Sequence, residues 1–518
     1  MPDAGYTVPA VLDRRAQQFG DRVMMSIAGT PVTFAQMRDR SCAAANVLAG
    51  LGIKRDETVA LFTGTCPEWV YFWLGAARLG AVPAAVNAAS KGDFLLHALR
   101  LSRAAVVVTD ADRHPRLVEV AGHVGTLRSV LVQGDALDDA LDSAPVEPPV
   151  ATADPLDIAL FFTSGTTGPS KAVVTTWQYL FTAARTVAAT WEFSAGDVLW
   201  TAMPLFHLSA APTVLAPMLV GGTSVLAAAF HPGTVWDEIR ACGAVGFAGA
   251  GAMVSMLWNL PPHPSDAETG LRFISAAPIA ADMYHAIEER YQCRVVTMYG
   301  LTEAFPIAYK AVSEYGRPGT SGHVNPDFEV RIVDLLGEPV PEGMVGEIAC
   351  RARSPHAMSE GYVASASGGH SLQVNPHSEW FRTGDLGVLD SDGNLTFVDR
   401  VKDSLRRRGE NVSSVEVEQT VMRHPAVSEA AAVGVPSDLG EDDILVVLTL
   451  RSGAVVDHAE LLDFCSARMP YFCVPRYLEV VDEIPKNVIG RVRKDVLRSR
   501  GLSEAAWDRE AHGYVLTR

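Results

Sequence analysis

The chain has 518 residues and a formal net charge of -17, with 48% hydrophobic and 20% charged residues. A chain of this length exceeds a single hydrophobic core, so we expect about two or three folding units. The composition is ordinary for a globular protein and excludes a disordered or fibrous chain. The negative charge repels nucleic acid and anionic membrane surfaces, so any phosphate ligand would need local donors.

The N-terminus and the cysteines bear on the location of the protein. Residues 1–22 carry charged side chains where a secretory signal would have an apolar core, so we expect a cytoplasmic protein. The seven cysteines are scattered without a CxxC pair, which argues against a disulfide framework or a zinc site. Prolines and a glycine pair interrupt the uncharged stretch from His207 to His231, so we predict buried core there and no membrane span.

Short apolar runs alternate with longer helix-like stretches along most of the chain. The alternation predicts an α/β fold in which parallel sheets are covered by helices. No repeat of fixed period is present, which argues against a solenoid or a propeller. In chain order, strands are expected at 59–64, 104–110, 129–134, 157–162 and 246–252, and helices at 68–81 and 93–104.

Two irregular segments and one change of texture divide the chain. Residues 134–157 are acidic and rich in proline, which indicates a surface connection, and a second irregular segment spans 364–378. Near residue 400 a basic cluster precedes a compact pattern of helix and strand at 416–425, 427–436, 444–451 and 459–469. We therefore predict a large N-terminal domain over 1–399 and a small mobile α+β domain over 400–518.

The expected strand at 157–162 leads into a loop of hydroxyl and glycine residues, TSGTTGPSK, at 163–171. Hydroxyls, backbone N–H groups left accessible by glycine, and one lysine are the donors that a triphosphate needs. The spacing is not GxxxxGK followed by Ser or Thr, which excludes the ordinary P-loop motif. Taken alone, the composition fits a surface turn equally well.

TSGTTGPSK closely resembles the signature loop of the adenylate-forming superfamily of acyl-CoA synthetases, adenylation domains and luciferases. The resemblance implies a loop that binds the β- and γ-phosphates of ATP. Ser170 and Ala172 stand where proline and glycine are common in that superfamily, and neither difference removes a donor. The phosphate-binding residues implied are Thr163, Ser164, Gly165, Thr166, Thr167, Gly168 and Lys171, with Thr166 a second candidate ligand of Mg²⁺.

Three further motifs resemble the superfamily in its own order. MPLFH at 203–207 is similar to the segment beside the acyl pocket and would make His207 an aromatic wall, although a lone histidine in an apolar run is more often plain core. SAAP at 275–278 is similar to the stretch that flanks the adenine, through Ala276, Ala277 and Pro278. TMYGLTE at 297–303 would contribute an adenine-stacking ring, the adjoining glycine, an α-phosphate donor and a carboxylate for Mg²⁺, which are Tyr299, Gly300, Thr302 and Glu303.

The resemblance continues around the predicted domain boundary. By analogy, Asp385 of WFRTGDLG would bind both ribose hydroxyls, and Arg400 would reach ribose or phosphate. Lys402 would be the hinge of the small domain, and Gly409 would line the pantetheine channel. Without the other motifs, a TGD turn and a solvated basic loop are the simpler interpretations of these segments.

One position departs from the superfamily pattern. Enzymes that activate carboxylates carry a lysine in a C-terminal PxxxxGK segment, whereas this chain reads PKNVIGR and has Arg491. A guanidinium is planar and broader than an ammonium, so geometry rather than charge is altered. Arg491 can act with altered reach, Lys486 or Lys494 can replace it, or the acid is not a carboxylate, as in relatives that adenylate nitrous acid for transfer to an aromatic amine.

The residues and the resemblance together predict an ATP- and Mg²⁺-dependent ligase that adenylates a small-molecule acid and passes it to coenzyme A. The residues expected to act in catalysis are Arg491, Lys171, Thr302, Glu303 and His207. A diazotase and a non-catalytic nucleotide sensor stay as alternative functions. We expect the protein to be a monomer or a homodimer. GGHSL at 368–372 matches a phosphopantetheine attachment motif, but no carrier domain surrounds it, so we interpret it as coincidence.

Overall fold

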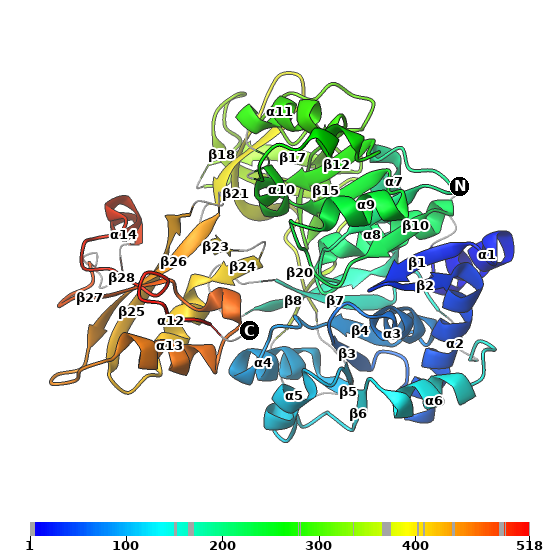
Figure 1. Cartoon of the computed structure of the whole chain (residues 1–518), viewed down its shortest axis with the longest axis horizontal. Coiled ribbons are helices and arrows are strands. Elements are labelled where there is room, and N and C mark those ends of the chain that lie inside the picture. Colours follow the sequence, from blue (N-terminus) through cyan, green and yellow to red (C-terminus); the bar gives the residue numbers. More distant parts are fainter. Residues whose placement is uncertain are drawn as a thin grey trace.

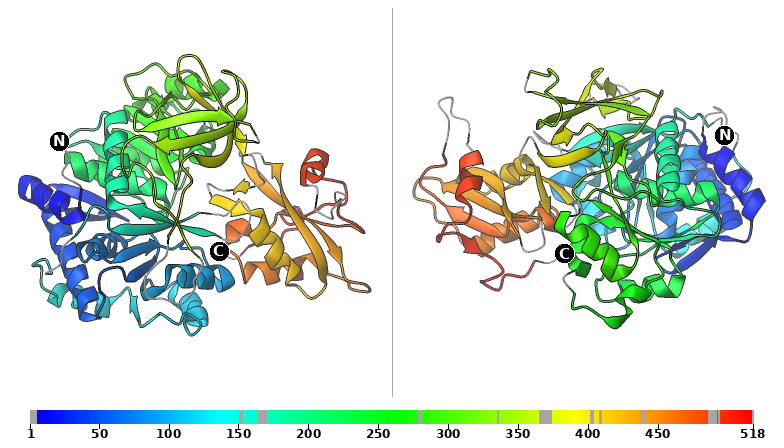
Figure 2. Two further views of the ribbon diagram at one scale, coloured as in Figure 1. Left: turned by 180° about the vertical axis from the view of Figure 1, so that it is seen from behind. Right: turned by 90° about the horizontal axis from the view of Figure 1, so that it is seen from above.

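The structure is a computed structural model that describes most of the chain. Figure 1 shows a large body from the blue N-terminal helices to the yellow strands, with a smaller orange and red body beside it. Figure 2 shows the same two bodies from behind and from above. The described residues are 6–149, 153–163, 170–258, 260–277, 279, 281–334, 336–364, 374–400, 404–407, 410–437, 441–485, 492 and 494–516.

One large sheet contains the strands on either side of the candidate phosphate loop. Its order is β20-β19-β8-β7-β4-β3-β5-β6, in which β3 to β7 are parallel and β7 and β8 form an antiparallel hairpin. The parallel strands are continuous apolar runs because both faces of the sheet are covered. The elements are β3 (Thr58–Phe62), β4 (Val82–Ala85), β5 (Ala104–Thr109), β6 (Ser129–Val132), β7 (Ile158–Thr163), β8 (Lys171–Thr176), β19 (Gly361–Val363) and β20 (Val374–Pro376), with α3 (Pro67–Arg78), α4 (Gly92–Ser102), α5 (His114–Ala121) and α6 (Asp135–Ser143).

A second large sheet has the order β13-β12-β11-β9-β10-β1-β2 and is parallel except for the β1–β2 hairpin. The carboxyl ends of β9, β11 and β12 therefore lie side by side. The elements are α1 (Val8–Phe19), β1 (Val23–Ile27), β2 (Thr30–Thr33), α2 (Phe34–Gly50), α7 (Trp177–Thr190), β9 (Val198–Thr201), η1 (Leu208–Ala210), α8 (Ala211–Val220), β10 (Thr223–Leu226), α9 (Val235–Cys242), β11 (Gly246–Ala250), α10 (Gly251–Trp258), η2 (Pro264–Glu268), β12 (Phe273–Ala277), α11 (Ala281–Tyr291) and β13 (Arg294–Val296).

A shared apolar core joins α2, α3, α7 and α8 to the two sheets. The Trp73 ring packs at tilted angles against the rings of Trp69 and Trp177, at ring-centroid distances of 5.4 and 4.9 Å. Gly75 lets α3 approach α2 closely, because a Cβ at this position would lie 2.9 Å from the Cβ of Ala44. This packed layer makes a rigid base for the strand ends that carry the candidate site.

Smaller sheets complete the large body. They have the orders β14-β15-β16 and β17-β18-β21-β22, both antiparallel. The β14–β15 hairpin packs with the second of these sheets in one core cluster. The strands are β14 (Met298–Leu301), β15 (Ala304–Tyr309), β16 (His323–Val324), β17 (Phe328–Val333), β18 (Gly346–Ala352), β21 (Phe381–Leu389) and β22 (Leu395–Arg400).

The C-terminal body has a core of its own and a sheet of order β25-β26-β27-β28. In Figures 1 and 2 its β23–β24 hairpin faces the large body, and α14 lies on the far side. The elements are β23 (Ser404–Arg407), β24 (Glu410–Ser413), α12 (Ser414–Met422), β25 (Val427–Pro436), β26 (Asp442–Leu450), α13 (His458–Ser466), η3 (Tyr471–Cys473), β27 (Tyr477–Val480), α14 (Lys494–Arg500) and β28 (Trp507–Asp508).

The α/β architecture with a smaller C-terminal body confirms the predicted fold class, and every strand and helix expected by residue range is present. The stretch from His207 to His231 forms η1, α8 and β10, and α8 is buried as predicted. Within the described residues, no helix is long and apolar enough to cross a membrane. The division at residue 399 stays a prediction, although β22 ends at Arg400 and β23 begins at Ser404.

The acidic segment 134–157 differs from the expected plain connection, because its first part forms α6. Leu137 and Leu141 are four residues apart and are both buried, so one turn-spaced apolar pair docks an otherwise polar helix. Asp135 and Asp138 lie in the first turn, where negative charge complements the helix dipole. The proline content and negative charge of the segment obscured this short amphipathic pattern in the sequence.

Candidate active site

The β7–β8 hairpin positions the ends of the predicted phosphate loop. Thr163 at the end of β7 pairs with Lys171 at the start of β8, so both residues flank the loop entrance. The Ser170 carbonyl lies 2.8 Å from Nε2 of His97 on α4. The Lys171 ammonium lies 4.6 Å from the centre of the Tyr362 ring on β19. Ser164, Gly165, Thr166, Thr167 and Gly168 lie outside the described residues.

Thr302 and Glu303 form the two-residue tip of the β14–β15 hairpin, since Leu301 pairs with Ala304. The Glu303 side chain is almost buried, and its Oε1 accepts a hydrogen bond of 2.6 Å from the Tyr362 hydroxyl. Gly300 permits this tight hairpin, because a Cβ there would lie 2.7 Å from the Ala304 carbonyl oxygen. The hairpin therefore holds one carboxylate at a fixed place beside the phosphate-loop strand.

Asp385 lies on β21 and is 3% exposed. Its Oδ2 accepts a hydrogen bond of 2.9 Å from the Tyr299 hydroxyl on β14. Burial, reinforced by the neighbouring Asp385 charge, raises the pKa of Tyr299 well above its usual value, so the phenol remains a donor. The Tyr299 ring stacks with Phe397 at 6.1 Å and is 7% exposed, so its predicted stacking on adenine stays a prediction.

These contacts bring the predicted nucleotide residues together. Lys171 contacts Tyr362, Tyr362 contacts Glu303, and Glu303 shares one short hairpin with Tyr299, which contacts Asp385. Lys171, Glu303 and Asp385 come from three separate sheets and are far apart in sequence. These contacts link the three side chains, and their binding of one nucleotide stays a prediction.

The second predicted group lies at the carboxyl ends of neighbouring parallel strands, where α/β proteins bind ligands. β11 and β12 pair residue by residue, with Gly249 opposite Ala276 and Ala250 opposite Ala277. A Cβ at Gly249 would lie 2.7 Å from the Phe247 ring, so the backbone there is closely packed. His207 follows the adjacent strand β9 and packs against Phe206. Pro278 lies outside the described residues.

The small body contacts this region with two carboxylates. Nε2 of His207 lies 2.8 Å from Oε2 of Glu410 on β24, at ion-pair distance but without hydrogen-bond alignment. Oε1 of Glu416 on α12 accepts the backbone N–H of Ser170 at 2.6 Å. Burial raises the pKa of Glu416 to about 7, although the Ser170 hydrogen bonds oppose the shift. Arg423 also pairs with Asp93 on α4.

The comparisons with known proteins agree with this geometry. Residues 12–363 match the family described as AMP-binding enzyme. The chain belongs to the AMP-binding enzyme family. Residues 416–491 also match its C-terminal domain.

Three relatives of this family member illustrate the likeness. A crotonobetaine/carnitine–CoA ligase of Salmonella paratyphi B is 30% identical over 95% of this chain and 99% of its own. The anthranilate CoA ligase AuaEII with anthranoyl-AMP has a TM-score of 0.72 at 25% identity, over 96% and 98% of the two chains. A double mutant of o-succinylbenzoate CoA synthetase (MenE) from Bacillus subtilis, bound with its product analogue OSB-NCoA, has a TM-score of 0.82 at 25% identity, over 95% and 98%. The protein is an AMP-forming ligase of the acid–CoA ligase type.

Several predicted residues of this AMP-binding enzyme lie outside the described residues, namely Lys402, Gly409, Lys486 and Arg491 and the motif at 368–372. Arg400 is described by its backbone, which pairs with Asp385 across β21 and β22. Lys494, a candidate replacement for the missing lysine, bonds Glu418 and Ser414 at 2.6 and 2.7 Å. In this arrangement Lys494 therefore links α14 to α12.

Sequence reasoning missed three residues of this region. Tyr362 was not singled out, and it follows the polar stretch RARSPHAMSEG, which carries no recognisable functional pattern. Glu410 and Glu416 lie within the basic and helical C-terminal pattern, where carboxylates are common on solvated faces. Their contacts depend on how two bodies dock, which no local pattern records.

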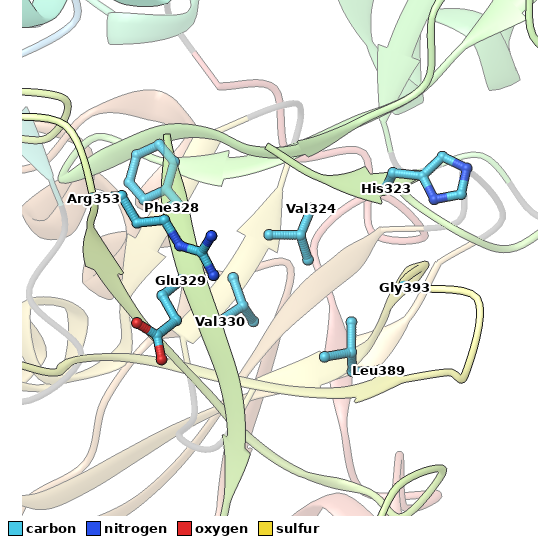
Figure 3. A pocket seen from close by; sticks show the side chains of 8 residues that line it. All are labelled: His323, Val324, Phe328, Glu329, Val330, Arg353, Leu389 and Gly393. Carbon is cyan, nitrogen blue, oxygen red and sulfur yellow. The ribbon is translucent and has the colours of Figure 1, made fainter. Parts of the chain in front are cut away.

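A cavity of about 350 Å³ lies elsewhere, in the smaller sheets (Figure 3). Its charged residues are Glu329, which pairs with Arg351, and the exposed Arg353. None of its lining residues belongs to the nucleotide group, so geometry and chemistry place the candidate site away from it. The cavity is lined by His323, Val324, Phe328, Glu329, Val330, Arg353, Leu389 and Gly393.

Proposed function

We propose that this enzyme activates a small carboxylic acid with ATP, releases pyrophosphate and transfers the acyl group from the adenylate to coenzyme A. The observation that carries the proposal is the continuous set of contacts from Lys171 through Glu303 to Asp385. Lys171 would bind the triphosphate, Glu303 would bind its metal, and the buried Asp385 would bind the ribose. The CoA ligase relatives support this reaction.

In the proposed nucleotide site, Lys171 and the loop 163–168 bind the β- and γ-phosphates, and Thr302 donates to the α-phosphate. Asp385 accepts hydrogen bonds from the ribose hydroxyls, with Arg400 nearby. Ala276, Ala277, Pro278, Tyr299 and Gly300 would surround the adenine. Preorganised donors and charges of this kind account for most of the catalysis of phosphoryl and adenylyl transfer.

Mg²⁺ fits the donor set of the hairpin. A carboxylate fixed at a hairpin tip is a hard oxygen ligand, and Mg²⁺ takes one or two such carboxylates beside substrate phosphates. We propose Glu303 as the carboxylate ligand, with Thr166 a second candidate. When bound, the metal would neutralise phosphate charge, while Glu303 keeps its place through Tyr362.

The acid would bind at the carboxyl ends of β9, β11 and β12, beside His207. Small residues at Ala248, Gly249, Ala250 and Gly251 keep side-chain bulk away from this edge. The acid would face the nucleotide, because Ala276 and Ala277 at the end of β12 belong to the proposed adenine group. His207 would close the pocket on the side of the small body.

The described arrangement of the two bodies suits the second step. The small body presents Glu410 to His207 and Glu416 to Ser170, and position 409 lies between β23 and β24 in the chain. The solved complex with a CoA product analogue has a TM-score of 0.82 to this chain, and the anthranoyl-AMP complex has a TM-score of 0.72. Both proteins are 25% identical to this chain. We assign the docked pose to thioester formation because the β23–β24 hairpin, which flanks position 409 in the chain, is the part of the small body that faces the large body.

The first step would use another pose of the small domain. α14, which directly follows Arg491 in sequence, lies on the face that points away from the large body (Figure 1). A rotation about Lys402 would bring Arg491 to the α-phosphate, where its charge would stabilise the entering acid. Because a guanidinium is planar and broader than an ammonium, Arg491 would contact the α-phosphate with a different geometry than a lysine would.

The test is ATP–pyrophosphate exchange with a panel of acids: crotonobetaine, carnitine, anthranilate, o-succinylbenzoate, short fatty acids and nitrite. We expect exchange with one class of carboxylate and, on adding coenzyme A, its thioester by mass spectrometry. Exchange with nitrite alone would replace the carboxylate by nitrous acid. Absence of exchange with every acid, in a protein shown to bind ATP, would overturn the catalytic proposal.

A further inference from the structure

The carboxylate-bearing hairpin tip is held from three directions. The Tyr179 hydroxyl on α7 donates to the Thr302 carbonyl at 3.3 Å, and the Ser359 backbone N–H donates to the Glu303 carbonyl at 2.8 Å. Both of these contacts fix the backbone of the tip. The Tyr362 hydroxyl, which donates to Oε1 of Glu303 at 2.6 Å, fixes the carboxylate itself.

Tyr362 also contacts the phosphate-loop strand. It pairs with Val173 across β19 and β8, so its side chain lies on the same face of the sheet as Lys171, two residues along β8. The Lys171 ammonium lies 4.6 Å from the ring centre, within the range of a cation–π interaction. One tyrosine therefore contacts the proposed phosphate lysine with its ring and the proposed metal carboxylate with its hydroxyl.

Neighbouring groups keep this tyrosine in one orientation. His377 meets the edge of the Tyr362 ring at 5.2 Å and an angle of 84°. Nε2 of His377 lies 2.8 Å from Oγ of Ser359, the residue whose backbone holds the hairpin tip. Burial lowers the pKa of His377 to about 4, so the ring is uncharged at neutral pH and adds no competing cation beside Lys171.

We propose that Tyr362 is a positioning residue that couples the metal carboxylate Glu303 to the phosphate lysine Lys171, an inference that rests on the proposed function. The Tyr362 hydroxyl would orient the Glu303 carboxylate toward the metal. The Tyr362 ring would hold the Lys171 ammonium toward the phosphates. Hydrogen-bond partners of metal ligands typically change metal affinity by about ten- to a hundredfold when removed. The two contacts of Tyr362 predict two separable defects.

Tyr362→Phe removes the hydroxyl and keeps the ring. We expect the affinity for ATP in excess Mg²⁺, measured by titration calorimetry, to fall about tenfold, with the affinity for ATP in EDTA unchanged. Tyr362→Leu removes the ring as well, and we expect its affinity for ATP to fall in EDTA too. Tyr291→Phe is the matched control, because it removes a buried hydroxyl that donates to the Leu257 carbonyl at 3.0 Å, away from the site.

The outcomes separate this inference from the proposed function. If the wild-type protein binds ATP equally well in Mg²⁺ and in EDTA, the assignment of Glu303 to a metal fails first. If Mg²⁺ strengthens binding in the wild type and Tyr362→Phe, folded with an unchanged melting temperature, responds to Mg²⁺ as the wild type does, the positioning role is overturned. The same loss of ATP affinity in Tyr291→Phe would indicate general destabilisation. That result would also overturn the positioning role of Tyr362.

Discussion

The nucleotide region within the large body and the interface with the small body are built differently. In the proposed nucleotide region the carboxylates Glu303 and Asp385 are nearly buried and bonded to tyrosines. At the interface, the Asp93 and Arg423 side chains are 54% and 51% exposed, and Glu410 and Glu416 make further polar contacts. The proposed function needs the first region to stay in place and the second to come apart.

Under the proposed function, this difference would let one site serve two reactions. A preorganised nucleotide region loses little entropy when the substrate binds, because its side chains are already ordered. A modest interface lets the small body leave and return without unfolding either core. The small body offers two faces, with the β23–β24 hairpin toward the large body and α14 away from it (Figure 2).

The largest effect should come from the nucleotide region. Glu303→Gln keeps an acceptor for the Tyr362 hydroxyl but removes the charge proposed for Mg²⁺. We expect ATP–pyrophosphate exchange at saturating Mg²⁺ to fall by about 10²- to 10³-fold, the usual loss on removing one preorganised electrostatic group. Glu314→Gln, which changes an exposed carboxylate elsewhere, is the control. A loss below about tenfold would place the metal on other ligands.

The next effect tests whether the two faces serve different steps. Arg491→Ala should slow pyrophosphate exchange by about a hundredfold, because a charge near the α-phosphate is lost. The transfer to coenzyme A from a supplied adenylate should stay within about threefold, since the hairpin face is unchanged. Arg500→Ala, on α14 and paired with Glu479, is the control. Equal losses in both steps would contradict the division of labour between the faces.

The two regions also differ in how far the sequence predicts them. Lys171 lies at the start of β8 and Glu303 at a hairpin tip, where polar residues beside apolar runs are visible in the sequence. Asp385 lies within β21 and was predicted from the resemblance of WFRTGDLG. Tyr362 escaped notice, because its contacts depend on a sheet that joins β8 to β19 across nearly two hundred residues. The pair formed by Ser170 and Glu416 spans 246 residues and two bodies, and only docking creates it.

A third prediction uses the raised pKa of Glu416. Burial raises the pKa of Glu416 to about 7 in the docked pose. If undocking returns this carboxyl to its ordinary pKa of 4.5, the docked pose holds the proton more tightly than the undocked one. Docking should therefore be strongest at low pH and weaken as pH rises through about 7, by at least about tenfold between pH 5 and pH 8. Energy transfer between dyes on α9 and α14 would report the docked fraction.

Glu416→Gln sharpens the same test. The amide still accepts the Ser170 N–H but does not titrate, so the docked fraction should become independent of pH over this range. Glu460→Gln, on the exposed surface of α13, should keep the wild-type profile. A wild-type profile in Glu416→Gln would show that Glu416 is not the source of the pH dependence.

The smallest effect should come from the exposed rim of the interface. Asp93 and Arg423 are both about half exposed, and such pairs contribute only about 0.2–1 kcal/mol because water screens them and long side chains lose entropy. A double-mutant cycle with Asp93→Asn and Arg423→Gln should therefore give a coupling of about twofold in the docked fraction at low salt, vanishing near 0.5 M salt. A coupling above about tenfold would mean that the rim, rather than Glu416 and Glu410, holds the small body in place.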